Sequence, residues 1–226
     1  SAYAALGKAN TDWLKEIFRL GRTLDGNVAV SGRVGKSDIF RMPYRVSIGY
    51  HNQDGTLKTS NLERETISVN LNPSFFDDHL LVNLNGKLMN MDNRFANQDA
   101  IGGAVRMDPT QPVYDANGLM NPVALLNDKL DKSNAKRFIG NAQLNYKVHG
   151  FEDLSLNLNL GLDWSKSDGT VDVAPGTEMS FHNTQESGSG YHNNYSQIRR
   201  DQTLEFYATA FNSGMAAISN TLMALA

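Results

Sequence analysis

The sequence contains no cysteine and no apolar run long enough to form a membrane-spanning helix. The lack of cysteine excludes disulfide scaffolds, zinc clusters built on thiolates and thiol catalysis. A spanning helix needs about 20 consecutive apolar residues, so any membrane role of this chain must come from strands. The length of 226 residues fits one large β domain or two ordinary domains and does not choose between them.

Charge of one sign is not concentrated anywhere along the chain. The net charge is -3, and the lysines and arginines are scattered instead of gathered in a stripe, which argues against nucleic acid as a partner. The first residues also lack the basic, apolar and small-residue order of a secretory signal. Because an exported protein is made with such a signal, we expect that, if this chain is exported, the signal was removed or the chain is a fragment.

What the sequence does contain is strict alternation of apolar and polar residues, most clearly between positions 154 and 164. Because side chains with period two cannot share one side of a helix, this segment is predicted to be a strand with one apolar face. The apolar positions are Leu154, Leu156, Leu158, Leu160, Leu162 and Trp164.

Similar alternation elsewhere predicts about seven strands, several of them near the roughly 9–11 residues that a tilted strand needs to cross a bilayer. The opposite positions are rich in asparagine, which fits the wet lumen of a large barrel. The predicted fold class is therefore all-β, a transmembrane antiparallel β-barrel. The further apolar sets lie at residues 28–34, 44–50, 67–75, 80–88, 138–148 and 204–208.

The predicted connections alternate between short and long, as they do in outer-membrane barrels. Residues 76–79 and 149–153 are tight turns, whereas residues 51–61, 92–136 and 165–195 are longer. The tight turns are then periplasmic and the long loops extracellular. About seven strands ending abruptly in lipid would leave unpaired backbone groups, so the sheet must belong to a larger closed barrel.

Aromatic residues near the predicted strand ends fit the two girdles of a membrane barrel. Tyr50 and Trp164 are expected near the outer interface, and Phe75, Tyr146 and Phe151 near the inner one. A soluble β-sandwich shows the same alternation, with its apolar face packed on a second sheet, and is the alternative fold.

The polar residues do not form a recognisable catalytic or metal site. The five histidines lack a ligand spacing such as His-x-x-x-His, and Asp77 and Asp78 lie in a tight turn, where Asp is expected for its own backbone hydrogen bonds. Paired carboxylates such as Glu63 and Glu65 have no supporting cleft. We therefore predict no enzyme activity, no catalytic residue, no cofactor and no metal.

Two segments outside the strands are predicted to be ordered. Residues 13–18 have the spacing of a short amphipathic helix with Asp12 as its N-cap. The long loop at residues 92–136 contains three of the 6 prolines and is interpreted as an ordered excursion. This loop is the best candidate for contacts with a substrate or a lid protein, and the alternative is that it only covers the barrel mouth.

Several motifs also follow one another between about residues 5 and 212. They are Asn10-Thr11-Asp12-Trp13, Tyr44-Arg45-Val46-Ser47-Ile48-Gly49-Tyr50, Asn70-Leu71-Asn72-Pro73-Ser74-Phe75, Met107-Asp108-Pro109-Thr110-Gln111-Pro112-Val113-Tyr114, Asn121-Pro122-Val123-Ala124-Leu125-Leu126 and Lys136-Arg137-Phe138-Ile139-Gly140-Asn141. In this order they resemble the barrel of the SusC/RagA-type TonB-dependent transporters of the bacterial outer membrane.

The resemblance implies a closed barrel of roughly 22 strands with a plugged lumen. Residues 1–212 would be part of that barrel, the plug domain would lie upstream of Ser1, and residues 213–226 stay unassigned. It also implies import of nutrients such as glycans or peptides, a SusD-like surface lipoprotein as partner, and energy from the TonB complex through the plug. The alternative function is a structural or adhesive β-sheet protein of the cell surface.

Candidate contacts with such cargo follow from the predicted faces. We expect Asn83, Asn85, Asn157 and Asn159 on the lumen side, where their amides can hydrogen-bond a substrate. The alternative is that they only keep the lumen wet. Tyr114, in the long loop, is a further candidate contact for the substrate or the partner.

Overall fold

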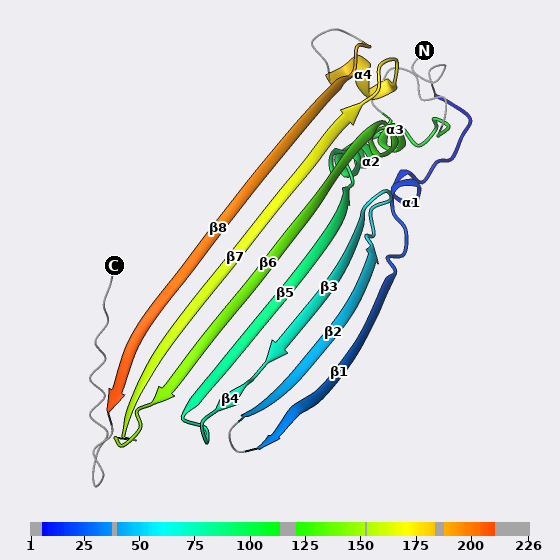
Figure 1. Cartoon of the computed structure of the whole chain (residues 1–226). Helices are drawn as coiled ribbons and strands as arrows, with labels where there is room; N and C mark the ends of the chain where they lie inside the picture. The colour runs from blue at the N-terminus through cyan, green and yellow to red at the C-terminus, as the bar shows by residue number, and fades with distance from the viewer. Residues whose placement is uncertain (1–5, 38–39, 114–120, 152, 184–187, 211–226) are drawn as a thin grey trace.

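The computed structural model describes residues 6–37, 40–113, 121–151, 153–183 and 188–210, which form one antiparallel sheet with a group of helices at one end (Figure 1). Seven long strands follow one another in chain order across the sheet, and β4, of 2 residues, lies off this path. The strands are β1 (Thr23–Ser37), β2 (Phe40–Asp54), β3 (Asn61–Leu71), β4 (Ser74–Phe75), β5 (Leu80–Phe95), β6 (Lys129–Lys147), β7 (Leu154–Val173) and β8 (Tyr191–Ala210).

The prediction of about seven antiparallel strands is confirmed, but the strands are longer than their apolar segments. β7 and β8 each contain 20 residues, and both ends of the segments 92–136 and 165–195, predicted as loops, are strand. β5 continues to Phe95 and β6 begins at Lys129. The extensions carry polar residues on both faces, so they lack the alternation from which the strands were predicted.

The apolar segment at residues 67–75 is divided into β3 and β4 because Pro73 has no N–H with which to continue the ladder. The register does not change across the interruption. Leu71 pairs with Tyr44, and Ser74, three residues further on, pairs with Arg41, three residues earlier, so the two strands share one register against β2. The residues of both strands therefore alternate as one strand.

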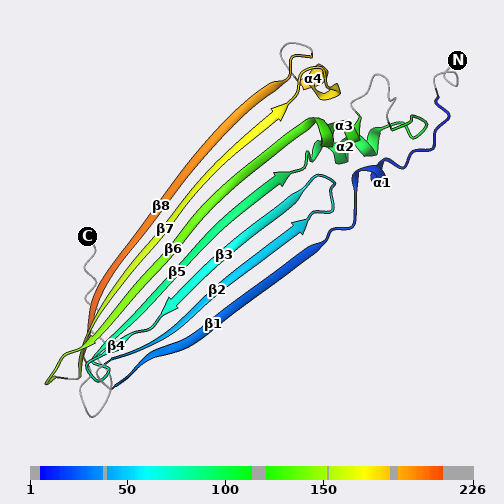
Figure 2. The ribbon, with the colours of Figure 1, turned by 45° about the vertical axis from the view of Figure 1, so that its right-hand side comes forward.

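The only cluster of buried apolar residues in the described part of the chain lies among the connections at one end of the sheet, and Val173 at the end of β7 is its one residue from a strand. Four helices contribute to it, and Figure 2 shows them together beyond one end of the strands. They are α1 (Trp13–Ile17), α2 (Asp99–Arg106), α3 (Pro122–Asp128) and α4 (Glu178–Asn183). We call these four helices, together with the residues that pack between them, the cap. Its buried apolar residues are Trp13, Ile17, Leu57, Ala100, Ala104, Met107, Leu125, Leu126, Val173 and Met179.

Local capping explains where two of these helices begin. Asp12 is the N-cap of α1, and its side chain accepts a hydrogen bond from the backbone N–H of Lys15 at 3.2 Å, which confirms the predicted helix. Asn121 caps α3 in the same way through the N–H of Val123 at 2.8 Å, with Pro122 at the first helical position, where its missing N–H costs nothing. Among the described residues, no helix is long and apolar enough to cross a membrane.

Shortening a buried side chain of the cap should loosen the cap. Leu126 is 2% exposed, so Leu126→Ala removes packed atoms and is expected to lower the free energy of unfolding by about 2–5 kcal/mol. The measurement is hydrogen exchange of the backbone amides of α3. Leu160→Ala on the sheet, where Leu160 is 41% exposed, is the control. Equal effects of the two substitutions would contradict the assignment of the core to the cap.

Candidate functional site

The strand register places the predicted apolar positions on one face of the sheet. Residues paired directly across strands point to the same side, and the pairing joins one apolar residue from each of six strands in a single row. The row runs through Val28, Ile48, Ile67, Leu88, Phe138 and Trp164. We call this side the outer face. Rows on the side of the tight turns continue the pattern, for example Ala142 beside Leu160 and Leu204.

The outer face has the dimensions of a lipid-facing wall. At about 3.3 Å per residue, the apolar segment at residues 154–164 is roughly 33 Å long, which at a tilt of about 40° gives an apolar band roughly 25 Å tall. Aromatic residues lie at its turn end, where the rings of Phe40 and Phe75 are 5.2 Å apart. Ile48 is 61% exposed, and no second sheet covers this face within the described residues, which contradicts the sandwich alternative.

The opposite face carries three consecutive rows of amide side chains, and we call it the luminal face. One row joins Asn83, Gln143, Asn159 and Glu205, and the rows beside it contain Asn85 with Asn141 and Asn145 with Asn157. The structure therefore places Asn83, Asn85, Asn157 and Asn159 on the same face of the sheet. Tyr114 lies outside the described residues.

These amides bind one another across the strands. The Nδ2 of Asn145 donates to Oδ1 of Asn157 at 2.6 Å, and the Nδ2 of Asn141 donates to Oδ1 of Asn159 at 2.8 Å. Asn159 in turn donates to Oε2 of Glu205 at 2.9 Å. Each amide can make more hydrogen bonds than these, so the luminal face combines fixed side chains with free donor and acceptor capacity.

The cap lies beyond the strand ends that carry the longer connections, and two of the sequence motifs meet in it. The indole Nε1 of Trp13 donates to the backbone oxygen of Asp108 at 3.0 Å, although 95 positions separate them. Thr11 donates through its backbone N–H to the oxygen of Pro109 at 2.8 Å and through its hydroxyl to Gln111 at 2.6 Å. The N-terminal segment is therefore fastened to the loop between β5 and β6.

A second fastening joins the N-terminal segment to the hairpin of β2 and β3. Arg19 contacts Oδ1 of Asp54 at 3.2 Å, and Arg22 contacts Oδ2 at the same distance. A hydrogen bond from Asn61 and another from Arg22, aided by the two positive charges, lower the pKa of Asp54 below its ordinary value. The carboxylate thus stays charged and holds both arginines.

A third fastening links the two long loops. Oε1 of Glu178 accepts a hydrogen bond from the backbone N–H of Asn121 at 2.7 Å, and Oδ2 of Asp128 accepts one from the N–H of Met179 at 3.2 Å. Helices α3 and α4 are therefore held to each other by reciprocal contacts. Val173, at the luminal side of β7, packs in the same core, so the cap joins the sheet on its luminal side.

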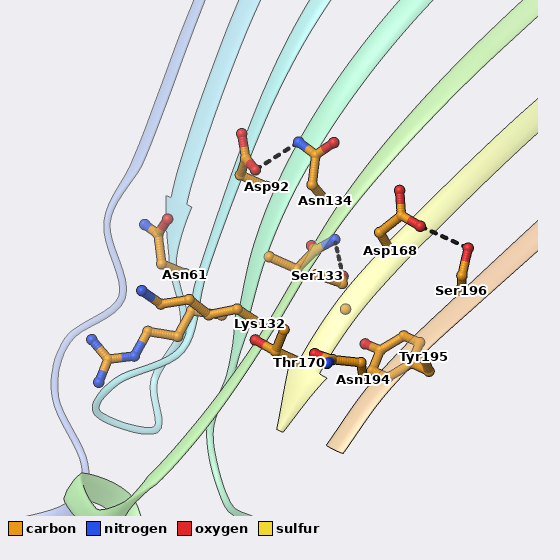
Figure 3. A pocket seen from close by; sticks show the side chains of 13 residues that line it. Asn61, Asp92, Lys132, Ser133, Asn134, Asp168, Thr170, Asn194, Tyr195 and Ser196 are labelled. Atoms are coloured by element: carbon orange, nitrogen blue, oxygen red, sulfur yellow. Dashed lines mark hydrogen bonds between the residues drawn. The ribbon is translucent and has the colours of Figure 1, made fainter. Parts of the chain in front are cut away.

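A polar hollow of about 680 Å³ opens on the strand extensions, and Figure 3 shows the side chains that line it. Asn134 donates to Asp92 at 2.8 Å, and Ser196 donates to Asp168 at 2.7 Å. Sequence reasoning missed this hollow because its residues were assigned to loops. Within the described residues, no group of three or more His, Asp or Glu side chains is arranged to hold a metal ion.

Comparisons with known proteins agree with this geometry. No family model matches the chain. The TonB-dependent receptor SusC of Bacteroides thetaiotaomicron is 39% identical over 204 residues, covering 76% of this chain and 20% of SusC. The TonB-dependent receptor P3 of Formosa agariphila is 29% identical over 166 residues, covering 65% of this chain and 16% of P3.

Solved structures agree on the fold. The RagAB peptide importer in its closed-closed state matches with a TM-score of 0.71 and 18% identity, covering 92% of this chain and 24% of that chain. Its open-open state matches with a TM-score of 0.68, covering 90% and 23%. The fold is that of part of the wall of a TonB-dependent transporter barrel. The chain is a homologue of the TonB-dependent receptor SusC, and it spans 20% of the length of SusC.

Acid should release the fastening at Asp108. The pKa of Asp108 is lowered mainly by a hydrogen bond from the backbone N–H of Thr110, and further by one from the hydroxyl of Thr110. The stabilisation is therefore fully present above the unfolded pKa of about 3.9 and is lost as the pH falls through the lower folded pKa. We expect hydrogen-exchange protection of the backbone amides of Thr110 and Gln111 to fall below about pH 4. Asp108→Asn should already lower it at pH 7, and unchanged protection in that variant would contradict this role.

Charge on the outer face should oppose insertion of the complete barrel. Leu158 lies near the middle of the apolar band, so Leu158→Arg is expected to destabilise the inserted protein by about 2–4 kcal/mol. The measurement is urea unfolding from phospholipid vesicles. Asn157→Arg, one position along β7 on the luminal face, is the matched control and should have a smaller effect. Equal stability of the Leu158→Arg protein and the unmodified protein would show that this face does not contact lipid.

Proposed function

We propose that residues 1–212 form part of the barrel wall of a transporter that imports nutrients such as glycans or peptides across the bacterial outer membrane. A SusD-like surface lipoprotein assists it, and the TonB complex supplies energy through the plug domain. The observation that carries the proposal is the division of every long strand between an apolar outer side and a polar luminal side, in a homologue of SusC. The proposal includes no catalytic step.

The strand edges support the need for a longer barrel. Within the described residues, β1 and β8 each pair with one neighbouring long strand, so each has one edge without a partner. Unpaired backbone groups cost several kcal/mol each in lipid. Closure by further strands satisfies them, and the matched relatives are long enough to supply those strands, because this chain covers 20% of SusC.

The amide rows of the luminal face suit uncharged polar cargo. Asn83, Asn85, Asn157 and Asn159 offer both donors and acceptors, which matches the hydroxyl groups of glycans and the amide groups of peptides. One hydrogen bond along β5, from Asn85 to Asn83, and the cross-strand bonds of Asn157 and Asn159 hold these side chains in place before cargo arrives. Less conformational freedom is then lost on binding. We propose these four residues as contacts for cargo passing along the wall.

The cap offers a surface for the lipoprotein. Helix α2 buries Ala100 and Ala104 in the core, whereas Ile101 and Val105, four positions apart, are 39% and 71% exposed. Side chains with this spacing lie on one side of a helix. Exposed apolar residues at the entrance of the barrel fit a protein contact, and we propose this side of α2 as part of it.

Uptake measurements test the proposal in cells that carry the complete protein. Deleting its gene should abolish energy-dependent uptake of radiolabelled oligosaccharides or oligopeptides, and a protonophore should have the same effect on the unmodified strain. The double substitution Asn157→Leu and Asn159→Leu should lower uptake about tenfold, because several hydrogen bonds to cargo are lost.

The matched control is Leu158→Ile, between these two residues on the outer face, which should leave uptake unchanged. Outer-membrane protein levels are compared by immunoblot in every strain. Equal uptake of all tested oligosaccharides and oligopeptides with and without the gene would sink the transport proposal.

A further inference from the structure

Two lysines face each other at the extracellular border of the apolar band. Lys136 on β6 lies directly opposite Lys166 on β7, and Arg200 on β8 lies opposite Trp164 in the next outer row. All three positions belong to the outer face by register. Like charges placed directly opposite each other destabilise a sheet, so this arrangement favours an anion that is shared between them.

Nearby carboxylates compensate only part of this charge. Nζ of Lys166 lies 2.9 Å from Oδ2 of Asp168, which also accepts a hydrogen bond from Ser196. Glu65 belongs to the same row but is separated from Lys136 by Asn90. The border therefore keeps net positive charge beside Trp164, at the height where lipid head groups meet the barrel.

An apolar hollow lies directly below these cations on the same face. It has a volume of about 410 Å³, and it exists because Gly86 and Gly140 face each other across β5 and β6, with Ala142 beside them. The ring of Phe138 closes its upper side, since a Cβ on Gly140 would meet this ring at 2.9 Å.

A second hollow, of about 480 Å³, connects the two levels. Lys136 and Trp164 line it together with Leu88, and Glu65 lies at its far side. At about 3.3 Å per residue, Lys136 and Ala142 are roughly 20 Å apart along β6. The charged border, the connecting hollow and the apolar hollow therefore follow one another along the outer face of β6. We call this series the path.

We propose that this path binds one glycolipid of the outer leaflet, with a head-group phosphate held by Lys136, Lys166 and Arg200 and an acyl chain lying over Gly140 and Ala142. A phosphate oxygen accepts strong hydrogen bonds from lysine and arginine, and the hollow gives an acyl chain a contact that a smooth leucine wall lacks. The inference rests on the membrane location proposed above.

Lipid binding to the complete, delipidated protein in detergent tests the inference. The probes are lipid A, dephosphorylated lipid A and inorganic phosphate, and bound probe is quantified by native mass spectrometry. The double substitution Lys136→Gln and Lys166→Gln should lower lipid A affinity about tenfold. Lys87→Gln, on the luminal face of β5, is the charge-matched control and should leave the affinity unchanged.

The apolar hollow is tested separately. Gly140→Leu and Ala142→Leu each fill it, and either should lower lipid A affinity severalfold, whereas Gly26→Leu, which points into open space on the same face, should not. The unmodified protein should bind dephosphorylated lipid A weakly, and inorganic phosphate should not displace lipid A at equal concentration.

Three results would overturn the inference. The first is displacement of lipid A by inorganic phosphate at equal concentration, which would indicate a free-anion site. The second is equal binding of lipid A and its dephosphorylated form. The third is unchanged binding of lipid A in all variants. Normal uptake and vesicle insertion alongside any of these results would leave the transport proposal standing. Equal stability of the Leu158→Arg protein and the unmodified protein in vesicles would instead reject the membrane location on which both proposals depend.

Discussion

Every backbone N–H and C=O within a bilayer needs a partner from the protein, and in this chain that partner is the neighbouring strand. The ladder therefore fixes the register, and the register fixes which side chains meet lipid. A slip of one residue would turn Leu158 inward and Asn157 outward, because side chains alternate with period two. From β2 to β8 the pairing runs without a shift. The shift in β1 falls between Val34 and Ser37, next to the turn.

Because the sheet is one layer, its strands cannot form a hydrophobic core with each other. The buried apolar cluster is instead assembled by the cap, from connections that are far apart in the chain. Trp13, Asp54 and Glu178 each fasten one connection to another through hydrogen bonds or ion pairs. The wall thus depends on lipid and neighbouring strands, whereas the cap has a core of its own.

The sequence allowed the membrane-level strands to be predicted because lipid on one side and water on the other impose a strict alternation. The same alternation predicted that Asn83, Asn85, Asn157 and Asn159 lie on the face of the sheet opposite the apolar residues. It failed beyond Trp164, where the residues of β7 are mostly polar and do not alternate, so that this part of the strand was predicted to be a loop. Helices α2, α3 and α4 were missed because their packing joins positions that are distant in the chain and that carry no periodic signal.

Charged side chains on the luminal face near the amide rows form ion pairs with one another. Nε of Arg137 donates to Oδ1 of Asp163 at 2.9 Å, and Nε of Arg199 donates to Oδ2 of Asp201 at 2.7 Å. Such pairs cancel most of their own field at a distance. Over β6 to β8, the luminal face therefore presents mainly neutral hydrogen-bonding groups. A wall of this kind discriminates poorly between anionic and cationic cargo, so selection by charge in the proposed transporter must fall on other surfaces, such as the cap.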